Sequence, residues 1–77
     1  MKNQSIRRKN ILIRFNKNLY NLKSIKLAIK EYQNLADFSL RQKNNYIEVV
    51  LKKINLEVRS IIKDEFCNYI LFLMKSN

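Results

Sequence analysis

The residue types that usually carry catalysis are scarce in this sequence of 77 residues. It has no histidine, which is the commonest general base and a usual zinc ligand. The single cysteine, Cys67, therefore has no histidine to activate it, and a lone cysteine is more often a packed apolar side chain. Asp64 and Glu65 are sequence neighbours on a predicted helix, where two solvated carboxylates are the better interpretation.

The sequence also lacks a phosphate-binding loop, because it contains no glycine with which to build one. We therefore predict that the protein is not an enzyme. We expect no catalytic residue, no metal site and no bound cofactor.

Positive charge is the second chemical feature of the sequence, with a net charge of +10. Residues 1–30 contain nine Lys/Arg and no acid, whereas residues 31–77 contain seven Lys/Arg and six Asp/Glu. A basic end of this kind could attract nucleic acid, an acidic peptide or an acidic protein surface. The alternative is that the lysines only keep one face of the protein solvated.

The segment EFCNYILFLM, residues 65–74, is apolar at eight of its ten positions. We predict that it ends a helix whose core stripe is Val58, Ile62, Phe66, Tyr69 and Leu73. Cys67, Leu71 and Met74 recur on the opposite side at i, i+4 and i+7. We predict that this second strip, with the adjacent Asn68, binds a second copy or a larger enzyme. The alternatives are that residues 1–9 cover the strip or that the last helical turn frays.

Periodicity places the elements that would position these residues. Apolar residues at every second position predict strands at 11–15, 36–41 and 46–52. Apolar residues at three- and four-residue steps predict a helix from Leu22 to Leu35 and another at about 56–74, capped by Asn21 and Asn55. Residues 1–9 lack periodicity and are predicted to be a flexible basic arm before a single domain, residues 10–77.

The order strand, helix, strand, strand, helix predicts a small two-layer α+β domain. We favour a three-stranded antiparallel sheet of order 2-3-1 with both helices on one face, which is a ferredoxin-like fold without its last strand. The alternative is order 1-2-3, with the first two strands parallel. In the favoured order the first strand is an open edge, which is a template for an incoming strand.

The residues around this first strand suggest what the edge could bind. An acidic peptide could pair with the main chain at Ile11 and Ile13. Its side chains would then meet basic residues on and beside the strand, namely Arg7, Arg8, Arg14 and Lys17. The alternative is that these charges only protect the edge from aggregation.

Two segments resemble the small D-type proteins of the His-Xaa-Ser system. LYNLKSIKLAIKEYQNLADFSL, residues 19–40, resembles the start of that family at Tyr20, Leu22, Ile25, Ala28 and Ala36-Asp37. EFCNYILFLMK, residues 65–75, resembles its terminal helix at Phe66, Asn68, Leu71 and Lys75. The departures are Asn21 for the usual Ser, Lys23 for a common acid, and a Met74-Lys75-Ser76 ending.

The resemblance implies a non-catalytic accessory protein in the maturation of a ribosomally made peptide. Its partners would be radical S-adenosylmethionine enzymes and a small precursor peptide, and the iron–sulfur cluster would belong to the enzymes. The alternative function is a small nucleic-acid-binding protein that uses the basic arm and the first helix. With no visible signal peptide and no apolar run long enough to span a membrane, we expect a cytoplasmic protein.

Overall fold

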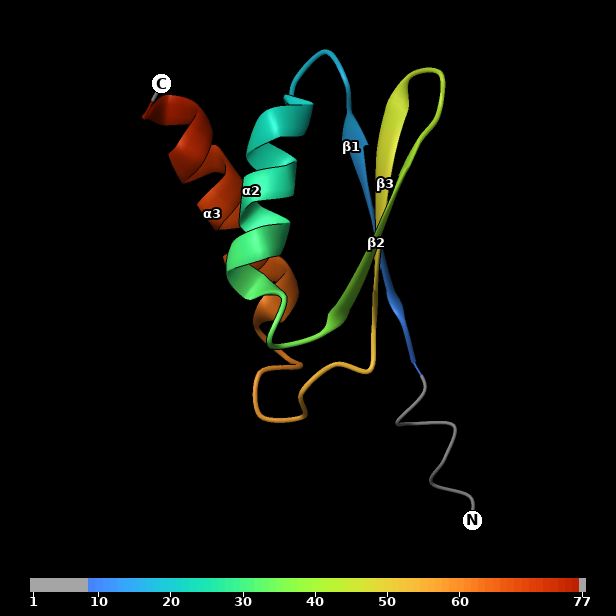
Figure 1. Ribbon diagram of the computed structural model, residues 1–77, viewed down its shortest axis with the longest axis vertical. Coiled ribbons are helices and arrows are strands. Elements are labelled where there is room, and N and C mark those ends of the chain that lie inside the picture. Colours follow the sequence, from blue (N-terminus) through green and yellow to red (C-terminus); the bar gives the residue numbers. More distant parts are fainter. Residues whose placement is uncertain (1–8, 77) are drawn as a thin grey trace.

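The computed structural model describes residues 9–76 and contains five elements: β1 (Ile11–Asn16), α2 (Leu22–Tyr32), β2 (Asp37–Gln42), β3 (Tyr46–Lys52) and α3 (Ile62–Lys75). The three strands form one antiparallel sheet of order β1-β3-β2. Both helices cover the same face of this sheet (Figure 1). The predicted α+β class, the 2-3-1 strand order and the one-sided helical layer are thus confirmed. Of the predicted arm, all but Lys9 lies outside the described residues.

The strands follow the alternation in the sequence. On β1, Ile13 and Phe15 are buried toward the helices, while Leu12 and Arg14 point to the helix-free face and are exposed. Antiparallel pairing sets Ile13 opposite Val49 of β3, so that apolar side chains lie beside one another across the sheet. The register therefore places one apolar face of the sheet under the helical layer.

The start of α2 is fixed by its cap. The Asn21 side chain accepts a hydrogen bond of 2.7 Å from the Ser24 backbone N–H, as predicted for an N-cap. Tyr20 precedes the cap and packs against the core near Phe15, with 4.9 Å between ring centroids. Ile25, at the fourth helical position, is fully buried, so the two residues take the positions of a hydrophobic staple.

The start of α3 differs from the prediction, because the helix begins at Ile62 and not near residue 56. The Asn55 side chain caps a turn instead, accepting a 2.8 Å hydrogen bond from the Glu57 backbone N–H. The acidic pair Asp64 and Glu65 then falls in the first helical turn, where the helix dipole favours negative charge. At 14 residues α3 is short, and within residues 9–76 no helix has the length and apolarity to cross a membrane.

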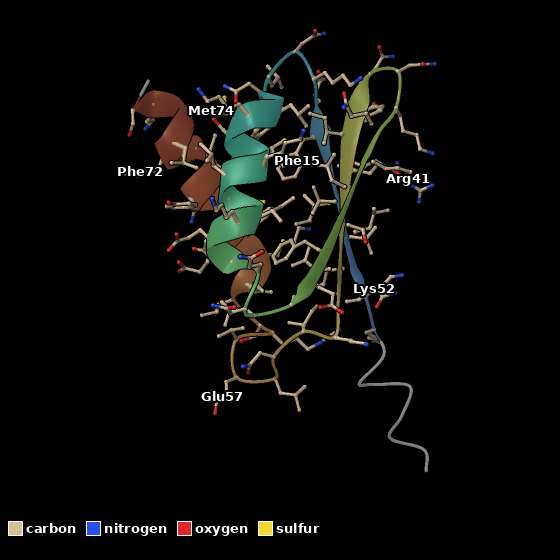
Figure 2. The ribbon with its side chains drawn as sticks, in the orientation of Figure 1. Phe15, Arg41, Lys52, Glu57, Phe72 and Met74 are labelled. Atoms are coloured by element: carbon tan, nitrogen blue, oxygen red, sulfur yellow. The ribbon has the colours of Figure 1, made fainter. Side chains whose placement is uncertain are left out.

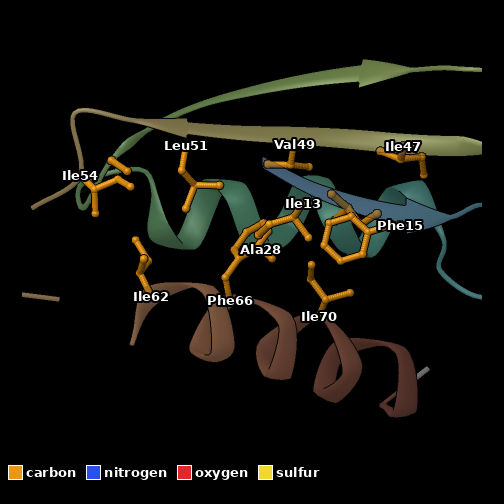
Figure 3. Packing of buried hydrophobic residues seen from close by; sticks show 12 residues of the cluster. Ile13, Phe15, Ala28, Ile47, Val49, Leu51, Ile54, Ile62, Phe66 and Ile70 are labelled. Atoms are coloured by element: carbon orange, nitrogen blue, oxygen red, sulfur yellow. The ribbon is translucent and has the colours of Figure 1, made fainter. Parts of the chain in front are cut away.

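Phe66 of α3 lies at the centre of the core and is fully buried (Figure 3). Its ring lies 6.4 Å from Phe15 of β1, 5.1 Å from Phe38 of β2 and 5.9 Å from Tyr32 of α2, measured between ring centroids. Aromatic pairs at such separations are favourable in tilted and edge-on geometries. One side chain of α3 therefore contacts both outer strands and the other helix.

The two helices divide the sheet between them. Figures 1 and 3 agree that α2 lies on the β2 side of the helical layer and α3 on the β1 side. The helix that follows the last strand therefore lies nearest the first strand, where a further strand of a longer sheet would be added.

Candidate functional site

In the part of the chain that the structure describes, one edge of strand β1 pairs with no other strand, and the main-chain groups on that edge can be identified. The Lys17 N–H donates to the Asn45 carbonyl at 3.0 Å, which continues the β1–β3 register by one pair. Hydrogen-bonded pairs alternate along an antiparallel ladder, so Phe15 and Ile13 bond to β3 in the same way. The N–H and C=O groups of Leu12 and Arg14 consequently point to the open edge.

The end of this edge after β1 is closed by local hydrogen bonds. The Asn16 carbonyl accepts from the backbone N–H groups of Leu19 and Tyr20, each at 3.0 Å. Before β1, the Lys9 carbonyl accepts from Arg59 Nη2 at 2.6 Å, and this bond involves none of the outward-facing groups of Leu12 and Arg14. Strand β1 itself is six residues long.

These main-chain directions correct the prediction for the edge. Ile13 is buried and Ile11 half-buried, and the alternation of the ladder turns the main chain of both toward β3. Leu12 and Arg14 face the edge in their place. Lys17 is exposed beside β1 as expected. The predicted contributors Arg7 and Arg8 lie outside the described residues.

The flank of α3 that faces away from α2 carries the predicted apolar strip. Tyr69 faces α2, with its ring 5.7 Å from Tyr32. An α-helix turns by about 100° per residue, so Cys67, Leu71 and Met74 lie on the flank away from Tyr69 and from α2. Figure 2 shows Phe72 and Met74 leaving α3 on different sides. Since α3 lies on the β1 side, the flank with Cys67 and Met74 lies toward β1, whereas Leu71, about 140° around the helix from the buried Phe66, points largely away from the sheet.

The predicted separation of this strip from the core is wrong for two of its three members. Cys67 and Met74 are half-buried and pack against the core, whereas Leu71 remains 41% exposed. Cys67 and Met74 lie about 80–100° around the helix from the buried Phe66 and so border the core, whereas Leu71 lies about 140° from it. Ile70, which the predicted stripe omits, is fully buried. Ile70 lies four residues after Phe66, and this spacing could have placed it on the core side of the helix.

Asn68 does not join this surface. It is exposed and lies on the solvent side of α3, away from the sheet. The surface beside β1 thus combines the edge main chain of Leu12 and Arg14 with the half-buried Cys67 and Met74 and the exposed Lys63 of α3. We call this the β1 edge surface. Partner binding by these residues stays a prediction.

Charge near the β1 edge surface is set by two ion pairs of Glu48 that the sequence analysis did not predict. Arg14 Nε donates to Glu48 Oε2 at 3.1 Å, and Lys43 Nζ lies 3.9 Å from Glu48 Oε1. The register places Glu48 between Arg14 on β1 and Arg41 on β2. The Glu48 side chain is only 10% exposed, against 61% for Arg14. A single covered acid among three cations leaves this part of the helix-free face positive.

The arrangement supplies binding groups and little reactive chemistry. Burial raises the pKa of the Cys67 thiol, with a smaller opposing influence from Lys63. A thiol with a raised pKa is mostly protonated at neutral pH and is a weak nucleophile. Among residues 9–76 there is no group of three or more His, Cys, Asp and Glu side chains that could hold a metal ion.

Comparisons of the chain with protein-family models, curated proteins and solved structures found no match.

Proposed function

We propose that this protein is a non-catalytic accessory protein that binds a peptide during the maturation of a ribosomally made peptide. The observation that carries the proposal is the open edge of β1, where the main-chain groups of Leu12 and Arg14 have no neighbouring strand within residues 9–76. A sheet edge binds an extended peptide through main-chain hydrogen bonds, while side-chain pockets provide specificity. This activity needs no catalytic residue.

The charges beside the edge favour an acidic peptide. Arg14, Lys17 and Lys9 lie on β1 or directly beside it, and all three are exposed. The pairing of Arg14 with Glu48 uses its Nε, so other guanidinium N–H groups are available to a ligand. The charges would guide an acidic peptide to the edge and hold it there.

The resemblance of residues 19–40 and 65–75 to the D-type proteins of the His-Xaa-Ser system supports a particular partner class. In this proposal the protein holds a precursor peptide for a radical S-adenosylmethionine enzyme, which supplies its own iron–sulfur cluster. A chain with one cysteine cannot bind such a cluster alone. The same proposal places the protein in the cytoplasm with the enzymes that it serves.

The test is a fluorescence anisotropy titration with any small precursor peptide found to be encoded near the gene, which this proposal requires to exist. Lys17→Glu is the informative variant, because the Lys17 side chain has no role in the Arg14–Glu48 ion pair. Lys30→Glu on α2 is the matched control, being the same charge reversal away from β1. We expect wild type and Lys30→Glu to bind alike and Lys17→Glu to bind weakly. Equal binding by all three proteins, or none by wild type, would reject the proposal.

Nucleic-acid binding is the second candidate function, and a row of lysines on α2 favours it. Lys23, Lys26 and Lys30 are exposed and border a shallow hollow of about 460 Å³ on the outer side of the helix, which also contains Leu22 and Leu27. Such a row could neutralise successive phosphates, and binding would then weaken steeply with salt. Titration with single-stranded DNA and RNA at two salt concentrations tests it, and Lys30→Glu, not Lys17→Glu, should then weaken binding.

A further inference from the structure

We infer that two copies of this chain form a symmetric dimer through the side of α3 that points away from the sheet, with the two α3 helices antiparallel. Five exposed residues make up this side: Asp64, Asn68, Leu71, Phe72 and Lys75. We call it the α3 outer face. The inference does not depend on peptide binding, because the α3 outer face and the open edge of β1 lie on different sides of α3.

The spacing along the α3 outer face suits contact with another helix. Four of its residues follow one another at steps of four, three and four, namely Asp64, Asn68, Leu71 and Lys75. Such steps average about 3.5 residues and are typical of the line of contact between two packed helices. At about 100° per residue, all four lie about 140–180° around α3 from the buried Phe66. They therefore form one line on the solvent side of the helix.

The apolar part of the α3 outer face is exposed in the single chain. Phe72 is 61% exposed and Leu71 is 41% exposed, and Phe72 projects outward from α3 (Figure 2). The Phe72 ring stacks on Tyr69, with 6.0 Å between ring centroids and 23° between the ring planes. A ring that is already held in place loses less freedom on binding. Covering these two side chains would remove apolar area from water and favour association.

The charges at the two ends of α3 indicate that the partner is a second copy. Asp64 and Glu65 lie in the first turn of α3, and Lys75 lies in the last turn. Within residues 9–76, none of the three forms an ion pair. An antiparallel pair of identical helices brings the first turn of one beside the last turn of the other. Opposite charges would then meet at both ends of the contact, because two-fold symmetry repeats each contact.

One register satisfies both the charged and the apolar positions. Asn68 lies four residues after Asp64, and Leu71 lies four residues before Lys75. If Asp64 is opposite the partner's Lys75, Leu71 is therefore opposite the partner's Asn68, and the two-fold axis passes between residues 69 and 70. The two Asn68 side chains then lie close to the axis. An amide both donates and accepts hydrogen bonds, so the two can pair, and a single Asn in such a line of contact fixes its register.

The local charge of α3 allows two copies to approach although the net charge of the chain is +10. Helix α3 contains two acidic residues and two lysines. The neighbouring α2 has Lys23, Lys26 and Lys30 exposed, and their mutual repulsion would confine the contact to α3. A contact between two helices of 14 residues stays below the roughly 1,200 Å² that stable interfaces bury. We therefore expect a weak and reversible dimer.

Sedimentation velocity of the full-length wild-type protein tests the dimer, at concentrations from about 10 μM to about 1 mM, which cover weak association. We expect a reversible change from monomer to dimer across this range. Leu71→Glu should remain monomeric. Leu12→Glu is the matched control, because Leu12 is 50% exposed but lies on the helix-free face of the sheet, and it should dimerise like wild type. A monomeric wild type, or equal behaviour of the two variants, would overturn the inference.

An exchange of charges tests the antiparallel arrangement. Asp64→Lys and Lys75→Asp should each weaken dimerisation by about tenfold, because each sets like charges together at both ends of the contact. The double variant should return the dissociation constant close to that of wild type. Both substitutions oppose the dipole of α3, so this recovery could not come from a more stable helix. A double variant that dimerises no better than the single variants would overturn the inference.

Discussion

The sheet has two open edges, and they differ in what lies above them. On β1 the inward-facing Ile13 and Phe15 are buried, whereas on β2 the corresponding Phe38 and Leu40 are only half-buried. In the helical layer, α3 lies on the β1 side and α2 on the β2 side. Cations border both edges, so charge alone does not distinguish them: Arg14 lies on β1, and Arg41 on β2 (Figure 2).

Main-chain availability does not distinguish the edges either. The Lys43 N–H donates to the Tyr46 carbonyl at 2.8 Å, and this pair continues the β2–β3 register. By the same alternation, the main-chain groups of Phe38 and Leu40 point outward from β2. The two edges therefore differ in how deeply their inward-facing side chains are buried, and not in the availability of main-chain groups. Near β2 the hollow at the start of the strand is lined partly by the polar Gln33, Asn34 and Asp37.

The largest expected difference between the edges is in core stability. Phe15→Ala should lower the free energy of unfolding by about 3–5 kcal/mol, because Phe15 is only 2% exposed and its loss leaves a cavity. Phe38→Ala should cost less, since that side chain is already half in water. Urea unfolding followed by circular dichroism measures both. An equal or larger cost for Phe38→Ala would show that the two strands are covered alike.

The ion pair on the helix-free face should give a smaller difference. Arg14→Gln removes the donor to Glu48, while Arg41→Gln on the opposite edge removes no ion pair found among residues 9–76. We expect Arg14→Gln to cost less than about 1 kcal/mol, because Arg14 is largely exposed, and Arg41→Gln to cost less still. The same unfolding measurement compares them. A larger cost at Arg41 would show that Glu48 depends on the β2 side.

The smallest expected effect concerns the thiol of Cys67 on α3. Burial raises the pKa of Cys67 in the folded state above its unfolded value. The folded state therefore holds the proton more tightly, and the stability this provides is present below the unfolded pKa and lost as pH rises through the folded pKa. Cys67→Ser should remove this loss of folding stability at alkaline pH. Alkylation at pH 8 should also be slower in native protein than in urea, and equal rates would mean that the flank is not packed.

Local patterns were sufficient to predict most of the fold. Alternation predicted the three strands, Asn21 predicted the start of α2, and the element order favoured the sheet order that the structure confirms. These features depend on near neighbours in sequence or on general rules of chain topology.

The candidate site was harder to predict because it depends on packing between elements. Cys67 and Met74 border the core of α3 and are half-buried, whereas periodicity placed them on a separate strip opposite the core stripe. The outward main chain of Leu12 and Arg14 depends on the phase of the β1–β3 ladder, which no residue type encodes. The ion pairing of Glu48 could not be predicted because it depends on the strand register, which places Glu48 between Arg14 and Arg41.

The most direct test of the central claim is amide hydrogen exchange, measured by NMR with and without a bound acidic peptide. In the free protein the amides of Leu12 and Arg14 on β1, and of Phe38 and Leu40 on β2, should exchange quickly, because all four point outward. With bound peptide, Leu12 and Arg14 should become protected while Phe38 and Leu40 remain fast. Protection at Phe38 and Leu40, or at none of the four amides while the peptide is bound, would contradict strand addition at β1.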